Sequence, residues 1–288
     1  MNRRTFLTST LAASAAAGLA PLPAWAKEKG AGMKLGLVTY LWGKDMDLPT
    51  LIDACEKSGL GGVEVRTQHK HGVEPSLSKE QRAEVKKRFA DSPVTLVGYG
   101  SNAQFHDKDP KKLEANIELT KKFIDLMHDC GGSGVKVKPN AFVKDVPKEK
   151  TIEQIGKSLN IVAAYGAEKG QEIRVECHGR GTSELPVMKA IFDVADHKNA
   201  KVCWNSNSCD TAGEGLEHNF SLVKDRFGAT VHVRELDVGN YPYQELMNLF
   251  VKMDYQGWIL LECRTNPKDK IAAMKKQHEV FNRMIGRK

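Results

Sequence analysis

The chain has 288 residues, a formal net charge of +7 and 41% hydrophobic residues. This length can form one large domain, because single α/β domains often reach about 250 residues. The positive charges are dispersed, and no Lys/Arg block is interleaved with aromatic residues, so the composition argues against nucleic acid as a partner.

The first 26 residues have the pattern of an export signal. Arg3 and Arg4 precede an uncharged, Ala-rich stretch that ends at Ala24-Trp25-Ala26. A charged start, an apolar run and an Ala-x-Ala exit are typical of a cleaved signal peptide, and the paired arginines favour the twin-arginine route. A membrane anchor is the alternative, but the apolar run is barely long enough to span a bilayer and contains Gly18 and two prolines. We therefore predict a periplasmic or secreted protein without a stable membrane anchor, whose mature part is a single domain over residues 27–288 with a net charge of +5.

Short apolar runs alternate with longer amphipathic runs from Met33 onward. The short runs predict eight strands, and a helical pattern follows each of them. The predicted strands are residues 34–39, 62–66, 93–99, 134–138, 172–177, 201–204, 230–234 and 258–263.

Four helix starts carry recognisable signals. Ser78-x-x-Gln81 and Thr151-x-x-Gln154 have the spacing of capping boxes, in which a hydroxyl and an amide satisfy free backbone donors of the first turn. Pro110 and Pro242 fit the first helical position, where a missing N–H costs nothing.

Strict alternation of strands and helices predicts a parallel sheet, and eight repeats in this length predict closure into a (β/α)₈ TIM barrel. The alternative is a doubly wound α/β sheet. That fold would place a G-x-G-x-x-G turn between an early strand and its helix, and the chain has no such turn.

The six cysteines show no C-x-x-C spacing and no cluster that would bind zinc. Cys177, Cys203 and Cys263 fall within predicted strands, so we expect structural thiols. A disulfide that involves Cys209 stays open.

Polar and ionisable residues gather at the predicted strand ends. In a (β/α)₈ barrel the active site lies at the carboxyl ends of the strands, whereas the barrel interior is usually filled by aliphatic side chains. So many ionisable groups on one rim are difficult to explain by packing, and we interpret the set as functional. The set is Glu64, Arg66, His69, His71, His106, Lys136, Lys138, Glu176, His178, Asn205, Asn207, His232, Arg234 and Glu262.

Alternation also indicates where some of these side chains point. Lys136 and Lys138 share one strand face, and burying them against helices without partners would be costly, so we expect both inside the barrel. Glu176 and His178 likewise share a face at the end of their strand. Glu64 has two interpretations, a contact with a substrate hydroxyl or an ion pair with Arg66.

Several of these segments together resemble the sugar phosphate isomerase/epimerase family of xylose-isomerase-like TIM barrels. The resemblance spans the mature chain, and the last two segments are the most distinctive. The segments are Gly-Val-Glu-Val-Arg at 62–66, Val-Glu-Cys-His-Gly at 175–179, Val-Cys-Trp-Asn at 202–205, Val-His-Val-Arg-Glu-Leu at 231–236, Tyr-Pro-Tyr-Gln-Glu-Leu at 241–246 and Tyr-Gln-Gly-Trp-Ile-Leu-Leu-Glu at 255–262.

The resemblance implies one divalent metal ion, Mn, Mg, Co or Zn. Family members hold it through a Glu, an Asp, a His and a Glu at the ends of the last four strands. By position these are Glu176, Asn205 in place of the Asp, His232 or Arg234, and Glu262. Asn205 offers only a neutral oxygen, which weakens the hold on a hard cation, and an arginine cannot be a ligand because its guanidinium stays protonated. If no metal binds, Lys136, Lys138 and Arg234 could supply positive charge instead.

The resemblance further implies that Glu176 and Glu262 are catalytic and move a proton between adjacent sugar carbons. We expect substrate contacts from Glu64, Arg66, His71, His106, Lys136, Lys138, His178, Asn207 and Arg234. The resulting hypothesis is an exported isomerase or epimerase that acts on a small keto sugar or related carbohydrate, with a homo-oligomer left open. Two alternatives remain, a lyase or hydratase of 3-keto sugars and a non-catalytic carbohydrate-binding protein with a degenerate metal site.

Overall fold

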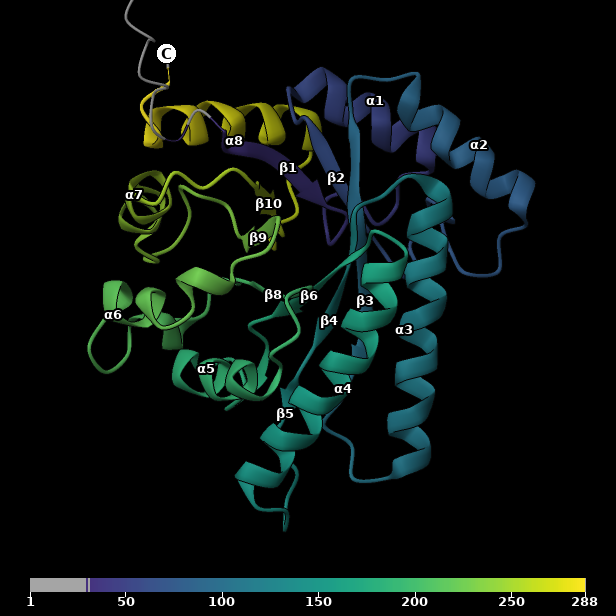
Figure 1. The fold of residues 1–288 in the computed structure, drawn as a ribbon. Helices are drawn as coiled ribbons and strands as arrows, with labels where there is room; N and C mark the ends of the chain where they lie inside the picture. Colours follow the sequence, from purple (N-terminus) through teal and green to yellow (C-terminus); the bar gives the residue numbers. More distant parts are fainter. Residues whose placement is uncertain (1–29, 31, 288) are drawn as a thin grey trace, which may run out of the picture.

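Eight parallel strands form one sheet with the order β8-β6-β4-β3-β2-β1-β10-β9 (Figure 1). The computed structural model describes Gly30 and residues 32–287, so the predicted export signal lies outside the described residues. The strands are β1 (Lys34–Val38), β2 (Gly62–Arg66), β3 (Thr95–Gln104), β4 (Gly134–Lys138), β6 (Glu172–Glu176), β8 (Ala200–Cys203), β9 (Thr230–Val233) and β10 (Trp258–Leu261).

All eight predicted strands are present, and the predicted TIM barrel is confirmed. The main difference is β3, which continues to Gln104, five residues beyond its predicted end. The sheet closes between β8 and β9 through a bridge just past the end of β8, where Asn205 pairs with His232. The His232 N–H donates to the Trp204 carbonyl there, at 2.8 Å. The barrel therefore closes at two of the predicted ligand positions.

Eight α-helices of the described chain surround the barrel (Figure 1). None of the helices in the described residues combines the length and the apolar composition that a transmembrane span requires. A short two-stranded sheet, β5 (Asn140–Ala141) with β7 (Gly179–Arg180), lies outside the barrel sheet. The helices are α1 (Leu48–Ser58), α2 (Lys79–Ala90), α3 (Pro110–Cys130), α4 (Lys148–Glu168), α5 (Leu185–Val194), α6 (Leu216–Ser221), α7 (Tyr243–Lys252) and α8 (Lys270–Met284).

Two of the four predicted helix starts are confirmed as they stand. Ser78 caps α2 in a capping box with Gln81. Pro110 is the first residue of α3 and follows the cap Asp109. Pro242 lies one residue outside α7, at the N-cap position.

The predicted capping box at Thr151 is wrong. Helix α4 begins at Lys148, so Thr151 is buried in its first turn. Gln154 does not reach back to Thr151, because its amide nitrogen donates to the carbonyls of Phe105 and Asp107 at 2.8 and 2.9 Å. Gln154 therefore ties α4 to the loop after β3.

The main apolar core lies between the barrel and its helices, and a smaller separate cluster consists of Val38, Val97 and Leu260. Leu260 is in register with His232, so both side chains point into the barrel. All six cysteines are free and five are buried, as expected for structural thiols.

Arg174 fills the barrel interior below the strand ends and is 1% exposed. Its guanidinium donates to Glu172 Oε2 at 2.8 Å, to the Val97 carbonyl at 3.0 Å and to Ser133 Oγ at 2.8 Å. Glycine provides the space, since a Cβ on Gly98 would lie 2.6 Å from Arg174 Nη1. A charged residue therefore occupies a place that aliphatic side chains usually fill.

We predict that Arg174→Met lowers the free energy of unfolding by about 3 kcal/mol, because it removes the cation that pairs with Glu172 inside the barrel together with its hydrogen bonds to Val97 and Ser133. Urea denaturation of the purified protein would measure the change. The control is Arg283→Gln on the exposed face of α8, which should change stability by about 0.5 kcal/mol or less. Equal stability of Arg174→Met and the unchanged protein would contradict this role for Arg174.

Candidate active site

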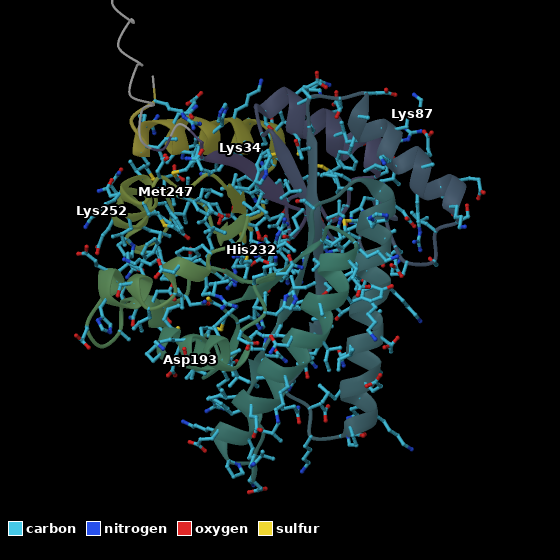
Figure 2. The ribbon with its side chains drawn as sticks, viewed as in Figure 1. Lys34, Lys87, Asp193, His232, Met247 and Lys252 are labelled. Atoms are coloured by element: carbon cyan, nitrogen blue, oxygen red, sulfur yellow. The ribbon has the colours of Figure 1, made fainter. Side chains whose placement is uncertain are left out.

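Three buried side chains meet at the carboxyl ends of the last strands. Glu176 ends β6, His232 lies on β9 and Glu262 directly follows β10. One donor atom of each lies within 4.8 Å of those of the other two. Their exposed fractions are 1%, 0% and 6%, and Figure 2 shows His232 near the centre of the barrel. Of His232 and Arg234, the two residues left open as ligand, His232 is the one that lies with the two glutamates.

Each carboxylate around this group has a cationic or imidazole partner. Lys136 Nζ lies 2.6 Å from Glu176 Oε2, and both side chains are almost fully buried. Lys136 and Lys138 point into the barrel, as expected from alternation.

Glu64 and Arg66 do not pair with each other. Arg66 Nη1 lies 3.2 Å from Glu262 Oε1, across the barrel mouth. Glu64 Oε1 lies 3.2 Å from His232 Nε2, and both side chains are fully buried. Gly100 makes this arrangement possible, since a Cβ there would lie 2.9 Å from Glu64 Oε1.

These contacts oppose the effect of burial on the carboxyl groups. Burial alone would raise the pKa of Glu176, but Lys136, His232 and His178 together hold it well below its usual value. Burial would also raise the pKa of Glu64, and His232 and Lys136 hold it low. Burial would lower the pKa of His232, but the neighbouring Cys203 and Glu64 raise it well above its ordinary value. These neighbours therefore favour the ionised forms of Glu176 and Glu64 in spite of their burial.

The donor set fits a divalent metal ion. Metal–ligand bonds of about 2.0–2.3 Å keep the donors of one ion within roughly 4.5 Å of one another, close to the spacing of Glu176, His232 and Glu262. His232 Nδ1 is buried and lacks a hydrogen-bond partner, whereas His232 Nε2 and Glu176 Oε2 face Glu64 and Lys136 in the ion pairs described above. Asn205 lies beside them, but its amide nitrogen donates to Glu176 Oε1 at 2.7 Å. In this arrangement Asn205 orients a carboxylate, and its role as a fourth ligand stays a prediction.

Other predicted residues also reach the mouth. Lys138 Nζ and Arg66 Nη2 share Asn102 Oδ1 as acceptor, at 3.1 and 3.4 Å. Burial, with Lys136 nearby, lowers the pKa of Lys138 to about 8. The imidazole of His178 is half-buried, and its Nδ1 has no hydrogen-bond partner. Lys138 and His178 thus remain candidates for substrate contact.

We expected His71 and Asn207 to contact a substrate, but their side-chain nitrogens already contact the backbone. Both ring nitrogens of His71 contact backbone, Nε2 with the Arg66 carbonyl at 2.8 Å and Nδ1 with the Val73 N–H at 3.0 Å. The Asn207 amide nitrogen donates to the carbonyls of Cys177 and Asn205 at 2.8 and 2.9 Å. Both side chains therefore support loops at the strand ends.

His106 follows the end of β3 and is half-buried. Its Nδ1 is buried without a hydrogen-bond partner, and burial lowers the pKa of the ring. No contact joins His106 to the group of Glu176, His232 and Glu262, so its role in substrate binding stays a prediction.

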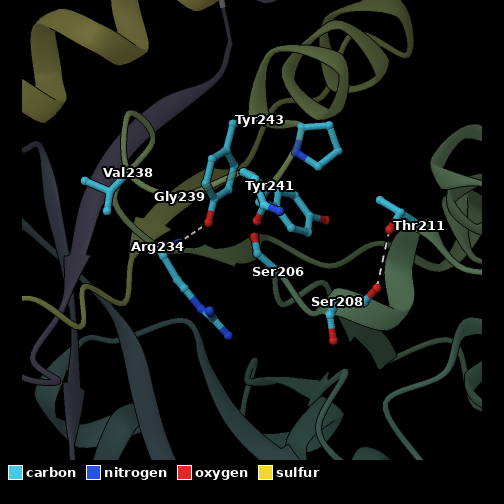
Figure 3. Close-up of a pocket in the computed structure, with 10 residues that line it drawn as sticks. Ser206, Ser208, Thr211, Arg234, Val238, Gly239, Tyr241 and Tyr243 are labelled. Atoms are coloured by element: carbon cyan, nitrogen blue, oxygen red, sulfur yellow. Dashed lines mark hydrogen bonds between the residues drawn. The ribbon is translucent and has the colours of Figure 1, made fainter.

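A pocket of about 250 Å³ adjoins the closure between β8 and β9. Arg234 and Tyr243 lie on one side of it and Ser208 and Thr211 on the other, with Ser206 and Tyr241 between them (Figure 3). Apart from Arg234, none of these residues was predicted from the sequence as a site residue. They lie in loops, in a 3-10 turn at Ser208–Thr211 and at the start of α7, where single hydroxyl groups have no periodic pattern. Only the Tyr-Pro-Tyr segment at 241–243 offered a signal.

Asp210 supports this pocket from behind and was also missed. Its side chain is fully buried, and Oδ2 accepts from Tyr241 Oη at 2.6 Å and from the Asn207 N–H at 2.9 Å. Burial raises the pKa of Asp210 to about 7, although these hydrogen bonds act in the opposite direction.

The chain belongs to the xylose isomerase-like TIM barrel family, whose model matches residues 52–284. A search of curated proteins finds no match for the chain.

Solved structures with the same fold include proteins of different activity. A 3-keto-D-glucoside 4-epimerase, YcjR, from E. coli has a TM-score of 0.74 at 14% identity, covering 87% of this chain and 99% of its own. The IOLI protein with a bound zinc atom has a TM-score of 0.73 at 13% identity, covering 88% and 98%. The probable 3-DHS dehydratase AsbF from Bacillus anthracis has a TM-score of 0.68 at 13% identity, covering 87% and 99%. At these identities the likeness establishes the fold.

We predict that Asp210→Asn changes the pH dependence of stability. The unfolded carboxyl group has a pKa near 3.9 and the folded one a pKa of about 7, so between these values the folded state holds one more proton. The free energy of unfolding of the unchanged protein should therefore fall, relative to Asp210→Asn, by roughly 1 kcal/mol per unit as the pH rises from 4.5 to 6.5. Urea denaturation of both proteins at several pH values measures this difference, and parallel curves would contradict it.

Proposed function

We propose that the protein is a sugar isomerase or epimerase that moves a proton beside the carbonyl of a keto sugar or related carbohydrate. One observation carries the proposal. The buried carboxylates of Glu176 and Glu262 come from different strands and meet at the barrel mouth, with oxygens within 4.8 Å of each other. Two opposed carboxylates are suited to removing a proton and returning it, and a binding module has no evident need for them.

We propose that Glu176, His232 and Glu262 hold one divalent metal ion, with Asn205 as a weak fourth ligand. Bound there, the ion would supply positive charge that stabilises the oxygen of a substrate carbonyl. The two carboxylates and the imidazole suit Mn, Mg, Co or Zn. The zinc atom in the structure of the IOLI protein supports the proposal, since that protein has the same fold.

In this reaction one glutamate takes the proton from the carbon next to the carbonyl, and the electron pair of the C–H bond forms an enediolate. Return of a proton to the other face of the same carbon gives an epimer, and return to the former carbonyl carbon gives an isomer. Lys136 and Arg66 hold the two carboxylates in place through their ion pairs. Lys138, which lies near Glu176, adds fixed positive charge near the developing oxyanion.

A lyase or hydratase acting on 3-keto sugars is the second candidate. The same proton abstraction can expel a β-substituent in place of returning the proton, so the acid–base groups need not differ. The similarity to a probable dehydratase of the same fold supports this alternative. A non-catalytic carbohydrate-binding protein is the remaining candidate, motivated by Asn205 in the place of an acidic ligand.

We also propose that the protein works in the periplasm or outside the cell, because its first 26 residues have the pattern of a twin-arginine signal. This location favours a free carbohydrate over a sugar phosphate as substrate.

We predict that the purified protein incorporates deuterium beside the carbonyl when it is incubated with keto sugars in deuterated water. Glu176→Gln and Glu262→Gln should each slow this exchange by about 10²- to 10⁴-fold, because each removes a proton-transfer group. NMR or mass spectrometry locates the deuterium, and elemental analysis should find about one divalent metal ion per chain, whose removal by a chelator slows the exchange.

Glu279→Gln on the exposed face of α8 is the matched control and should exchange at the unchanged rate. Loss of a β-substituent from 3-keto sugars, with little return of deuterium, would replace the isomerase by the lyase. Carbohydrate binding without exchange for any sugar tested would replace both by the binding protein.

A further inference from the structure

The barrel mouth carries more positive charge than its carboxylates balance. Glu176 pairs with Lys136, Glu262 with Arg66 and Glu64 with His232. Lys138 and Arg234 are further cations of the mouth, and no carboxylate among residues 32–287 lies within ion-pair distance of either. Lys138 faces Asn102 and Glu176, on the side of the proposed proton transfer.

Arg234 lies on the other side and lines the 250 Å³ pocket. It follows His232 by two residues, so it lies just past the end of β9, nearer to the mouth than His232. The pocket also includes Ser206, which directly follows Asn205. The pocket therefore lies along the chain segments that directly follow Asn205 and His232 at the closure between β8 and β9. A substrate whose reacting carbons lie at the buried group would extend past these segments to enter it.

The backbone of Arg234 is fixed by a hydrogen bond, and its guanidinium has a free donor. The Tyr243 hydroxyl accepts a hydrogen bond from the Arg234 N–H at 2.9 Å and fixes the backbone. The Arg234 Nε is buried and has no hydrogen-bond partner. A buried donor without a partner costs free energy, which a ligand that accepts from it would recover.

The rest of the pocket is suited to an anion with hydroxyl groups. Ser206, Ser208 and Thr211 place hydroxyl groups in its lining, and no acidic side chain of the described chain lines it. Asp210 lies behind the wall, where its carboxylate accepts from Tyr241 and Asn207. It does not reach Arg234 at ion-pair distance.

We propose that this pocket binds the carboxylate of an acidic sugar, so that the substrate class is a uronate or related sugar acid. The inference rests on the proposed function for the position of the reacting carbons. A single guanidinium matches the charge and the planar shape of a carboxylate through two parallel hydrogen bonds. A doubly charged phosphate would need further cations, and Lys138 is directed to the reaction side.

The test measures binding without turnover. Isothermal titration calorimetry compares D-glucuronate and D-galacturonate with the neutral sugars D-glucose and D-galactose, and with glucose 6-phosphate. We expect the unchanged protein to bind a uronate at least tenfold more tightly than its neutral counterpart. In Arg234→Gln the affinity for the uronate should fall by about 10- to 100-fold and the preference should disappear. Arg283→Gln, on the exposed face of α8, should keep it.

Equal affinity for uronates and neutral sugars, or a preference that survives Arg234→Gln, would overturn the inference. Tighter binding of glucose 6-phosphate that depends on Arg234 would overturn the assignment to a carboxylate. The result is separable from the exchange assay. Uronate binding that depends on Arg234, without proton exchange, would support the inference and contradict the proposed function. Proton exchange with neutral sugars, without a preference for uronates, would support the proposed function and contradict the inference.

Discussion

The buried ion pair between Lys136 and Glu176 is the contact on which the rest of the site depends. The two charged atoms are 2.6 Å apart, and both side chains are almost completely removed from solvent. Burying either charge alone would cost several kcal/mol, so each side chain requires the other. With Lys136 in place, Glu176 stays ionised at the end of β6 and accepts a further hydrogen bond from Asn205. Asn205 in turn forms the bridge to His232 that closes the barrel.

The same requirement shapes the barrel interior. Charged side chains replace part of the usual aliphatic layers, and glycines leave the space that they need. Arg174 fits because Gly98 has no side chain, and Glu64 fits because Gly100 has none. Paired charges in a rigid interior are preorganised, so a reaction at the mouth would need little rearrangement when negative charge develops. The unpaired Arg234 at the edge of this layer is the exception, and it has space in front of it.

The alternation of side chains along the strands was enough to predict the strands and part of the barrel interior from sequence. It identified the eight strands and the inward direction of Lys136 and Lys138, because period-two patterns and the cost of burying a lone lysine are local arguments. The ion pairs between side chains of different strands could not be predicted from the sequence. Arg66 and Glu262 are 196 residues apart, so only the strand order and register bring them together. Glu64 was considered with its sequence neighbour Arg66 for the same reason, whereas its partner is His232.

Loop residues were the other difficulty. His71 and Asn207 are of types that contact substrates, but both use their side-chain nitrogens on nearby backbone. That use depends on the path of the loop, which residue type does not encode. Asp210 was missed for the converse reason, since nothing near it in the sequence indicates that it is buried under Tyr241. The Thr151 capping box failed because α4 starts one turn earlier.

The central claim is that Glu176, His232 and Glu262 act together on one ion beside the substrate carbonyl. Anomalous X-ray diffraction from crystals grown with Mn²⁺ tests it most directly. The account predicts one anomalous peak, from an Mn²⁺ ion bonded to Glu176, His232 and Glu262. Crystals that contain Mn²⁺ but show no peak among these three residues, with Lys136 still paired to Glu176, would contradict it.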